Sequence, residues 1–115
     1  MTRHHAEVDR ALTEARTDCF ARLALGRRGK VLGATIVGPR AGETLAEVTL
    51  AVRHGLTATD LASSIHPYPT YDDGVWSAAI AAVKGRLARS SVRRTTGALV
   101  ALHRSLGSRL TGAVR

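Results

Sequence analysis

The chain has 115 residues, which suits one domain with a modest core, and 44% of them are hydrophobic. It contains no run of 18 apolar residues and no signal-peptide pattern, so we expect a soluble, cytoplasmic protein without a membrane partner. Its single cysteine, Cys19, excludes an internal disulfide and a cysteine-based metal cluster. We expect Cys19 to be a small buried hydrophobe.

The net charge of +8 comes from the end of the chain. Residues 1–83 hold nine basic and nine acidic side chains, whereas residues 84–115 hold eight basic ones and no acidic one. Such a tail can bind phosphates without sequence preference, so nucleic-acid or anionic-surface binding is an alternative function. However, no aromatic residue follows Trp76 to stack on bases. Leucines spaced three or four apart over residues 95–114 instead predict an amphipathic helix that packs on the body or on a partner.

Residues 1–18 are polar and mixed in charge and form a lead-in segment. His4 and His5 are neighbours in sequence and should point to different faces, so we predict no metal site there. The first residues are expected to lack regular structure. Residues 7–14 favour about two helical turns, with Val8, Ala11 and Leu12 on one side.

A β-hairpin is predicted next, with strands at residues 19–25 and 30–37 around a turn that has a glycine at each end. Gly33, inside the second strand, indicates a close approach by another backbone. The stretch 38–42 then breaks the strand. Its two glycines suggest a phosphate loop, but the lysine of that motif is absent, which disfavours phosphate binding.

Three helices follow in the prediction. The first covers residues 43–54, with Leu45, Val48 and Val52 on its buried face, and ends at Gly55 as a left-handed cap. A short helix at 61–64 leads into a loop rich in proline, and a third helix covers about 72–87. Only four aromatic residues are present in the chain, so the core must be built from small side chains.

The loop runs His66-Pro67-Tyr68-Pro69-Thr70-Tyr71-Asp72-Asp73. Two prolines in four residues favour a stiff, extended segment. Thr70 is predicted to cap the following helix through its hydroxyl, while the Asp73 carboxylate reaches back. A rigid loop with two tyrosines is typical of a segment that offers groups to a ligand or a partner. A structural turn that only docks a helix is the alternative.

The stretch 29–43, together with Glu47, Gly55 and residues 66–70, resembles the C-terminal dimerisation domain of the FAD-dependent pyridine nucleotide-disulfide oxidoreductases. The resemblance covers residues 7–83. It implies an antiparallel sheet flanked by helices, pairing with a second subunit, and a proline loop that enters the flavin site of that subunit. In several members a histidine directly before the second proline acts as acid and base, and a glutamate five residues later orients it.

At the position of that histidine this chain has Tyr68, and at the position of the glutamate it has Asp73. The tyrosine resembles mercuric reductase, although the C-terminal cysteine pair typical of that enzyme is absent. His66 lies two positions early and is the second candidate for an acid or base. The resemblance therefore points to Tyr68 as a residue that positions substrate, with Asp73 and His66 as further site residues and no metal ligands.

We therefore predict an α+β fold with an antiparallel sheet flanked by helices: a lead-in over 1–18, a dimerisation domain truncated at its N-terminus over 19–90, and a basic amphipathic helix over 91–115. The flavin, nicotinamide and redox-cysteine regions are not in this sequence, so the chain alone should bind no cofactor and transfer no hydride. The complete enzyme implied by the resemblance uses FAD and NAD(P)H. The expected function is dimerisation and completion of an active site, as a homodimer or with a separate flavin-domain subunit. A fragment without function is a further alternative.

Overall fold

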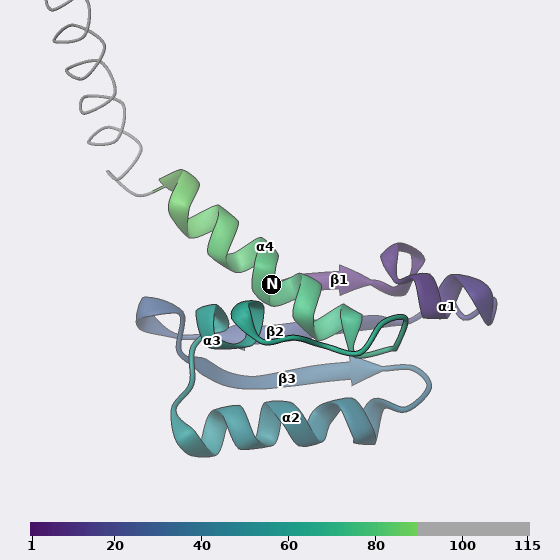
Figure 1. Cartoon of the computed structure of the whole chain (residues 1–115), viewed down its shortest axis with the longest axis horizontal. Helices are drawn as coiled ribbons and strands as arrows, with labels where there is room; N and C mark the ends of the chain where they lie inside the picture. Colours follow the sequence, from purple (N-terminus) through teal and green to yellow (C-terminus); the bar gives the residue numbers. More distant parts are fainter. Residues whose placement is uncertain (90–115) are drawn as a thin grey trace, which may run out of the picture. The chain divides into compact units, whose positions relative to one another are not determined.

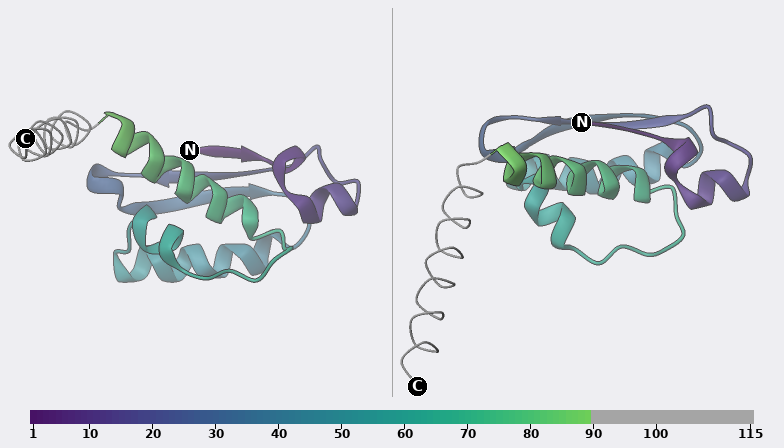
Figure 2. Two further views of the ribbon diagram at one scale, coloured as in Figure 1. Left: turned by 45° about the horizontal axis from the view of Figure 1, so that its top comes forward. Right: turned by 90° about the horizontal axis from the view of Figure 1, so that it is seen from above.

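The computed structural model describes residues 1–89, and residues Met1–Lys84 form one compact unit (Figure 1). The three strands build one antiparallel sheet in the order β1-β2-β3. Seen edge-on, the sheet has helices α2, α3 and α4 on the same side (Figure 2). The predicted α+β fold, an antiparallel sheet flanked by helices, is confirmed. In chain order the elements are β1 (Thr2–His4), the 3-10 helix η1 (His5–Glu7), α1 (Asp9–Thr13), β2 (Phe20–Leu25), the 3-10 helix η2 (Arg27–Gly29), β3 (Val31–Val37), α2 (Ala41–His54), α3 (Ala58–Ser63) and α4 (Asp73–Arg89).

The predicted hairpin is present as strands β2 and β3. The register places Phe20 opposite Val37, and it shifts by one residue at a bulge between Ala24 and Leu25. Side chains alternate between the two faces of a pleated strand. Leu23 is accordingly buried, whereas Leu32, on β3 beside the bulge, is exposed. The alternation directs one face of the hairpin toward the helices.

The expectation that the chain begins without regular structure is wrong. Residues 2–4 pair with β2 as strand β1, with Thr2 opposite Arg22. The terminal amino group of Met1 also donates a hydrogen bond to the Leu23 carbonyl oxygen over 2.7 Å. A polar edge strand gives little signal in a single sequence, because its stability comes from the ladder formed with a distant segment. The helix expected at 7–14 is shorter and exposes Leu12.

The predicted helix at 43–54 exists as α2 and ends at Gly55 with φ of 68°, as expected for a left-handed cap. Its buried face was predicted correctly at Val48 and incorrectly at Leu45 and Val52. Thr44, Val48 and Ala51 are buried, whereas Leu45 and Val52 are about two-fifths exposed, at 41% and 40%. The helix is turned toward its smaller residues because these allow close contact with the sheet.

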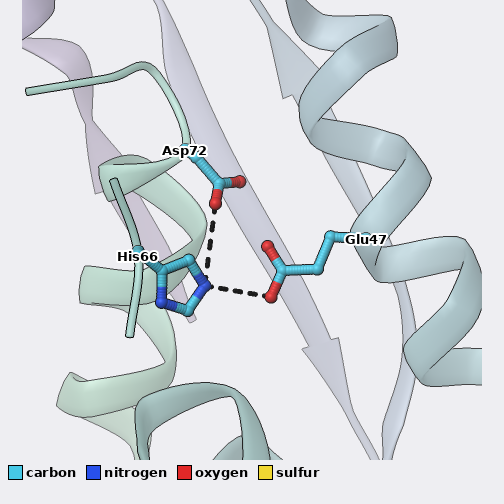
Figure 3. A group of neighbouring side chains, drawn as sticks. All are labelled: Glu47, His66 and Asp72. Atoms are coloured by element: carbon cyan, nitrogen blue, oxygen red, sulfur yellow. Dashed lines mark hydrogen bonds and ion pairs between the residues drawn. The ribbon is translucent and has the colours of Figure 1, made fainter. Parts of the chain in front are cut away.

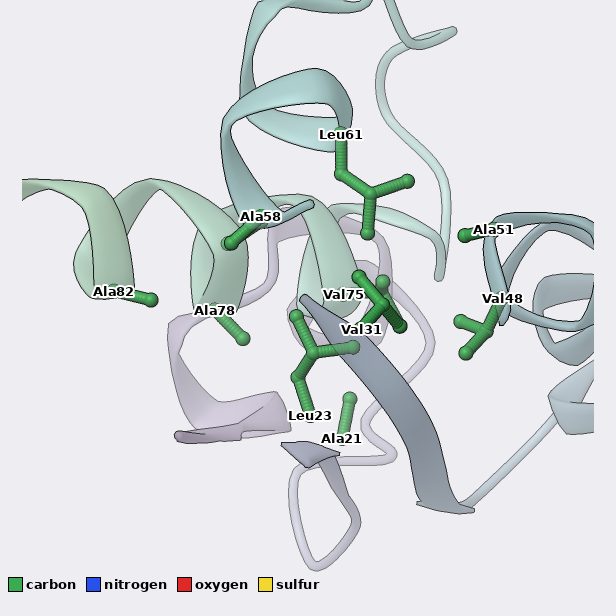
Figure 4. Packing of buried hydrophobic residues seen from close by; sticks show 11 residues of the cluster. Ala21, Leu23, Val31, Val48, Ala51, Ala58, Leu61, Val75, Ala78 and Ala82 are labelled. Carbon is green, nitrogen blue, oxygen red and sulfur yellow. The ribbon is translucent and has the colours of Figure 1, made fainter. Parts of the chain in front are cut away.

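The core is made of small side chains, as the scarcity of aromatic residues predicted (Figure 4). Six of its eleven buried residues are alanines, and several of these lie on α4, which therefore packs close to the sheet. A second, smaller cluster joins Val8 and Ala11 to Tyr71. The eleven members of the main cluster are Ala21, Leu23, Val31, Val48, Ala51, Ala58, Leu61, Val75, Ala78, Ala79 and Ala82.

The close approach by another backbone that was predicted at Gly33 does not occur within residues 1–89. No atom of these residues lies within 4 Å of the place where a β-carbon of Gly33 would stand, whereas side chains approach Gly38 closely. A β-carbon on Gly38 would lie 2.9 Å from Cε1 of His5 and 3.0 Å from Cβ of Cys19. Gly38 also has a φ of 146°, so its lack of a side chain serves both the turn and the packing. Cys19 is buried, as expected.

Within residues 1–89, strand β3 pairs with β2 along one edge, and its other edge is bridged only at its start, where the Val31 N–H donates to the Leu56 carbonyl oxygen over 2.9 Å. Beside it lies an apolar groove of about 380 Å³ whose lining includes Gly33, Leu45 and Val52. None of the helices among these residues is long and apolar enough to cross a membrane. The helix predicted at 95–114 and the rest of the basic tail lie outside the described residues.

Candidate functional site

The proline loop connects α3 to α4 and is held firmly at both ends. On the α3 side Leu61 is buried at 3% exposure, and on the α4 side Tyr71 is equally buried. Within the loop the Thr70 hydroxyl donates to the Pro67 carbonyl oxygen over 2.9 Å, and the peptide bond between Tyr68 and Pro69 is cis. The loop is therefore fixed by contacts inside it and at its ends.

Two large side chains project from this fixed loop. Ile65 is 99% exposed and Tyr68 is 68% exposed, although apolar side chains of this size are normally covered. The Tyr68 hydroxyl donates a hydrogen bond to Asp9, at the start of α1. That bond raises the pKa of the phenol above its ordinary value, with smaller contributions from burial and from the charges of Asp9 and Asp73. The outward position of Tyr68 agrees with the prediction, and its role as a positioning residue stays a prediction.

Asp73, the second predicted site residue, is buried at the start of α4. Its Oδ2 atom accepts a hydrogen bond from the Thr70 backbone N–H over 3.4 Å, so half of the predicted capping exchange is present. The other half is absent, because the Thr70 hydroxyl donates to Pro67 instead. Burial raises the pKa of the Asp73 carboxyl, and the Thr70 N–H opposes that rise. These contacts describe a helix cap, and a catalytic role stays a prediction.

His66, the third predicted residue, is the centre of a cluster that the sequence did not indicate (Figure 3). Its side chain is only 6% exposed. The Nε2 atom lies 3.0 Å from Oε1 of Glu47 on α2 and 3.6 Å from Oδ2 of Asp72, just before α4. The Nδ1 atom lies 3.0 Å from the carbonyl oxygen of Ser64. Three separate parts of the chain thus meet at one imidazole.

The cluster shifts the pKa of its members. Burial lowers the pKa of His66. The hydrogen bond to Glu47, the charges of Glu47 and Asp72 and the Ser64 carbonyl raise it by more, so the pKa of His66 is higher than its ordinary value. Burial, contact with Glu47 and the charge of Glu47 raise the pKa of Asp72 to about 7, against the opposing charge of His66. Two carboxyl groups that share a buried site do not easily ionise together.

A shallow cleft of about 250 Å³ adjoins the cluster. Glu47 and Asp72 lie in its wall, so the cluster borders a space that a small ligand can enter. The other lining residues are Arg40, Glu43, Thr44, Pro67, Thr70 and Tyr71. A cleft lined by three carboxylates and one cationic residue suits a small polar or cationic ligand.

Sequence reasoning missed that Glu47 and Asp72 contact His66. Glu47 is 19 residues from His66 in sequence, and no local periodicity connects a helix to a loop. The one available signal was the position of Glu47. Its neighbour Val48 belongs to the buried face of α2, and a carboxylate placed next to that face needs a polar partner.

The fold and the proline loop together define a small α+β interaction domain. Residues 2–79 match the family described as the pyridine nucleotide-disulphide oxidoreductase dimerisation domain, which is most of the chain. The chain belongs to this family, and the predicted resemblance is confirmed.

Curated relatives of the chain are dihydrolipoyl dehydrogenases. The enzyme of Haloferax volcanii is 46% identical over 71 residues, which is 61% of this chain and 15% of the relative. That of Thermus scotoductus is 51% identical over 49 residues, 43% of this chain and 11% of the relative. The mitochondrial enzyme of Sus scrofa is 39% identical over 83 residues, 70% of this chain and 16% of the relative. The chain therefore spans less than a fifth of the length of these relatives.

Proposed function

We propose that this domain pairs with a second subunit and places its proline loop in the active site of that subunit. The observation that carries the proposal is the exposure of Ile65, at 99%, and Tyr68, at 68%, on a loop whose two ends are buried. A loop that is rigid and still displays large side chains is suited to enter a partner without a large loss of conformational entropy. The family's description as a dimerisation domain supports self-association.

Tyr68 is proposed to position a substrate through its phenol. A tyrosine has an ordinary pKa of about 10, and the contact with Asp9 raises the pKa of Tyr68 further, so it is a poor base at neutral pH. It can nevertheless donate a hydrogen bond to a thiolate or orient a thiol-bound or soft-metal substrate. We propose this role for Tyr68 because the tyrosine before Pro69 resembles the residue of mercuric reductase at the same position.

FAD and NAD(P)H are proposed to be held by the flavin and nicotinamide domains of the complete enzyme, in the same subunit or in a separate one. The glycine-containing turn before α2 does not fit a dinucleotide phosphate. Cε1 of His5 lies 2.9 Å from where a β-carbon of Gly38 would stand, so a side chain already covers this turn at the first of its two glycines. Phosphate binding at such a turn requires open backbone N–H groups.

Self-association is tested by sedimentation velocity of the whole chain at micromolar concentrations. We expect a dimer, and we expect Ile65→Asp to shift it toward monomer, because a charge would be buried at the interface. Leu50→Asp is the matched control, since Leu50 is 58% exposed on α2, outside the loop and its supports. A parent chain that sediments as a stable monomer at these concentrations would refute the pairing.

The role of the loop is tested in a chimera. The chain replaces the corresponding segment of the Thermus scotoductus dihydrolipoyl dehydrogenase, which supplies the remainder of a complete enzyme. We expect Tyr68→Phe to lower turnover without changing dimer mass or melting temperature. We expect Asp73→Asn and His66→Gln to affect stability more than the chemical step. A selective loss of turnover with His66→Gln in a folded dimer would assign the acid and base role to His66.

A further inference from the structure

The cluster of Glu47, His66 and Asp72 brings together three side chains that are ordinary ligands of divalent metal ions. One ligand atom from each lies within 4.8 Å of the others. They come from α2 and from the two ends of the proline loop, so the fold builds the arrangement (Figure 3). We propose that these three residues bind a divalent transition-metal ion of the zinc type. Imidazole together with carboxylate oxygens is a donor set that zinc accepts.

The hydrogen bonding of His66 points to a cation at Nε2. The Ser64 carbonyl oxygen, 3.0 Å from Nδ1, can only accept a hydrogen bond, so Nδ1 carries a hydrogen. In a neutral imidazole the lone pair is then on Nε2, which faces the Glu47 and Asp72 carboxylates. Three electron-rich atoms facing one another require a proton or a metal ion between them. Histidines that bind metals usually donate their other N–H to a backbone carbonyl or a carboxylate, as His66 does to Ser64.

The two carboxylates supply a second observation. A proton on Nε2 serves the oxygen of Glu47 at 3.0 Å well and that of Asp72 at 3.6 Å poorly. The other oxygen of Asp72, Oδ1, is buried and has no hydrogen-bond partner among the described residues. A single proton on Nε2 therefore serves one carboxylate only, whereas an ion of charge +2 would neutralise both carboxylates together.

The spacing of the ligand atoms also suits a small ion. In a tetrahedral site with bonds of about 2.0–2.1 Å, ligand atoms are about 3.4 Å apart. The separations of 3.0 and 3.6 Å from Nε2 lie on either side of that value. Glu47 and Asp72 also line the cleft of about 250 Å³, which offers an entry path and room for water or another ligand at a fourth position.

The test uses the whole purified chain, freed of metal with a chelator, and Zn²⁺ as the probe. Isothermal titration should give one site per chain, and Co²⁺ in its place should give the visible absorption of a four- or five-coordinate site. Nitrogen-15 spectra of the imidazole should show the Nε2 signal of His66 moving when Zn²⁺ is added. Glu47→Gln and Asp72→Asn, which keep the shape of each side chain, should weaken binding by roughly tenfold or more.

Two variants control for adventitious binding. His54→Gln removes an exposed imidazole at the end of α2, and His4→Gln removes another at the end of β1, both outside the cleft. Both should bind Zn²⁺ like the parent chain. The proposal is overturned if Zn²⁺ leaves the His66 Nε2 signal unmoved, or if Glu47→Gln and Asp72→Asn bind as the parent does. The spectra of the parent chain decide the question even where a variant does not fold, and they do not depend on self-association.

Discussion

His5 provides the sharpest test of the packing. The side chain is fully buried, at 0% exposure, beside the Tyr71 ring, whose centroid is 5.6 Å away. Neither ring nitrogen has a hydrogen-bond partner among the described residues. Burial lowers the pKa of His5, and the negative charge of Asp18 opposes this only in part. We therefore expect the folded protein to hold His5 neutral where an unfolded chain already binds a proton.

The size of the effect follows from the unfolded state. A group that binds a proton only when the chain is unfolded lowers the free energy of unfolding by about 1.36 kcal/mol per pH unit. With an unfolded pKa of 6.5, the loss between pH 7.5 and pH 5.5 reaches at most about 1.4 kcal/mol. Because folding lowers the pKa of His5, its contribution to the free energy of unfolding is present above pH 6.5 and is lost as the pH falls.

The perturbation is His5→Leu, which keeps a similar volume and removes both nitrogens. At pH 7.5 we expect it to raise the free energy of unfolding by about 1–3 kcal/mol, because an unpaired buried polar group is removed. Urea denaturation at pH 7.5 and pH 5.5 should then show a smaller loss on acidification than in the parent. His4→Leu, at the exposed neighbouring position, is the control. An equal acid loss in His5→Leu and the parent would refute the reasoning.

Two further predictions concern the cores. Leu23→Ala should lower the free energy of unfolding by about 2–5 kcal/mol in urea denaturation, since Leu23 is only 1% exposed, and a loss below about 1 kcal/mol would contradict its place in the core. Tyr71→Phe should cost less, because it removes only the hydrogen bond donated to Oε2 of Glu14 over 2.7 Å. That bond lowers the pKa of Glu14. In urea denaturation, the difference in free energy of unfolding between Tyr71→Phe and the parent should therefore shrink as the pH falls below 4.5 through this lowered pKa. A difference that does not change with pH would contradict this prediction.

Local patterns were sufficient to predict the hairpin, the three main helices and the cap at Gly55. In each case a glycine or a change of period marks the boundary within a few residues of the element itself. The proline loop could be located from its two prolines. Its three candidate residues came from the family resemblance, and their roles stay predictions. The family resemblance supplied the predicted role of Tyr68, before Pro69, in positioning a substrate, which no local pattern indicates.

Long-range contacts account for what was missed. Strand β1 forms because residues 2–4 pair with β2, and the paired residues are 16 to 20 positions apart in sequence. Three residues are too few for a periodic pattern to predict a strand. The face of α2 was predicted to include Leu45 and Val52, but the helix is turned so that these two are partly exposed and Thr44 is buried beside Val48. The contact of Glu47 with His66 likewise joins a helix to a loop, so neither residue alone indicates the cluster.

The proline loop also depends on the lead-in segment more than its prolines suggest. The Tyr68 hydroxyl donates to Asp9, the Tyr71 hydroxyl donates to Glu14, and the Tyr71 ring packs near His5. Prolines limit the conformations of the loop, but these contacts select where it lies, because they join residues 57 to 66 positions apart. Residues 5–14 are therefore structural supports of the segment proposed to enter the partner. Changes there should alter the presentation of Tyr68 without touching the loop itself.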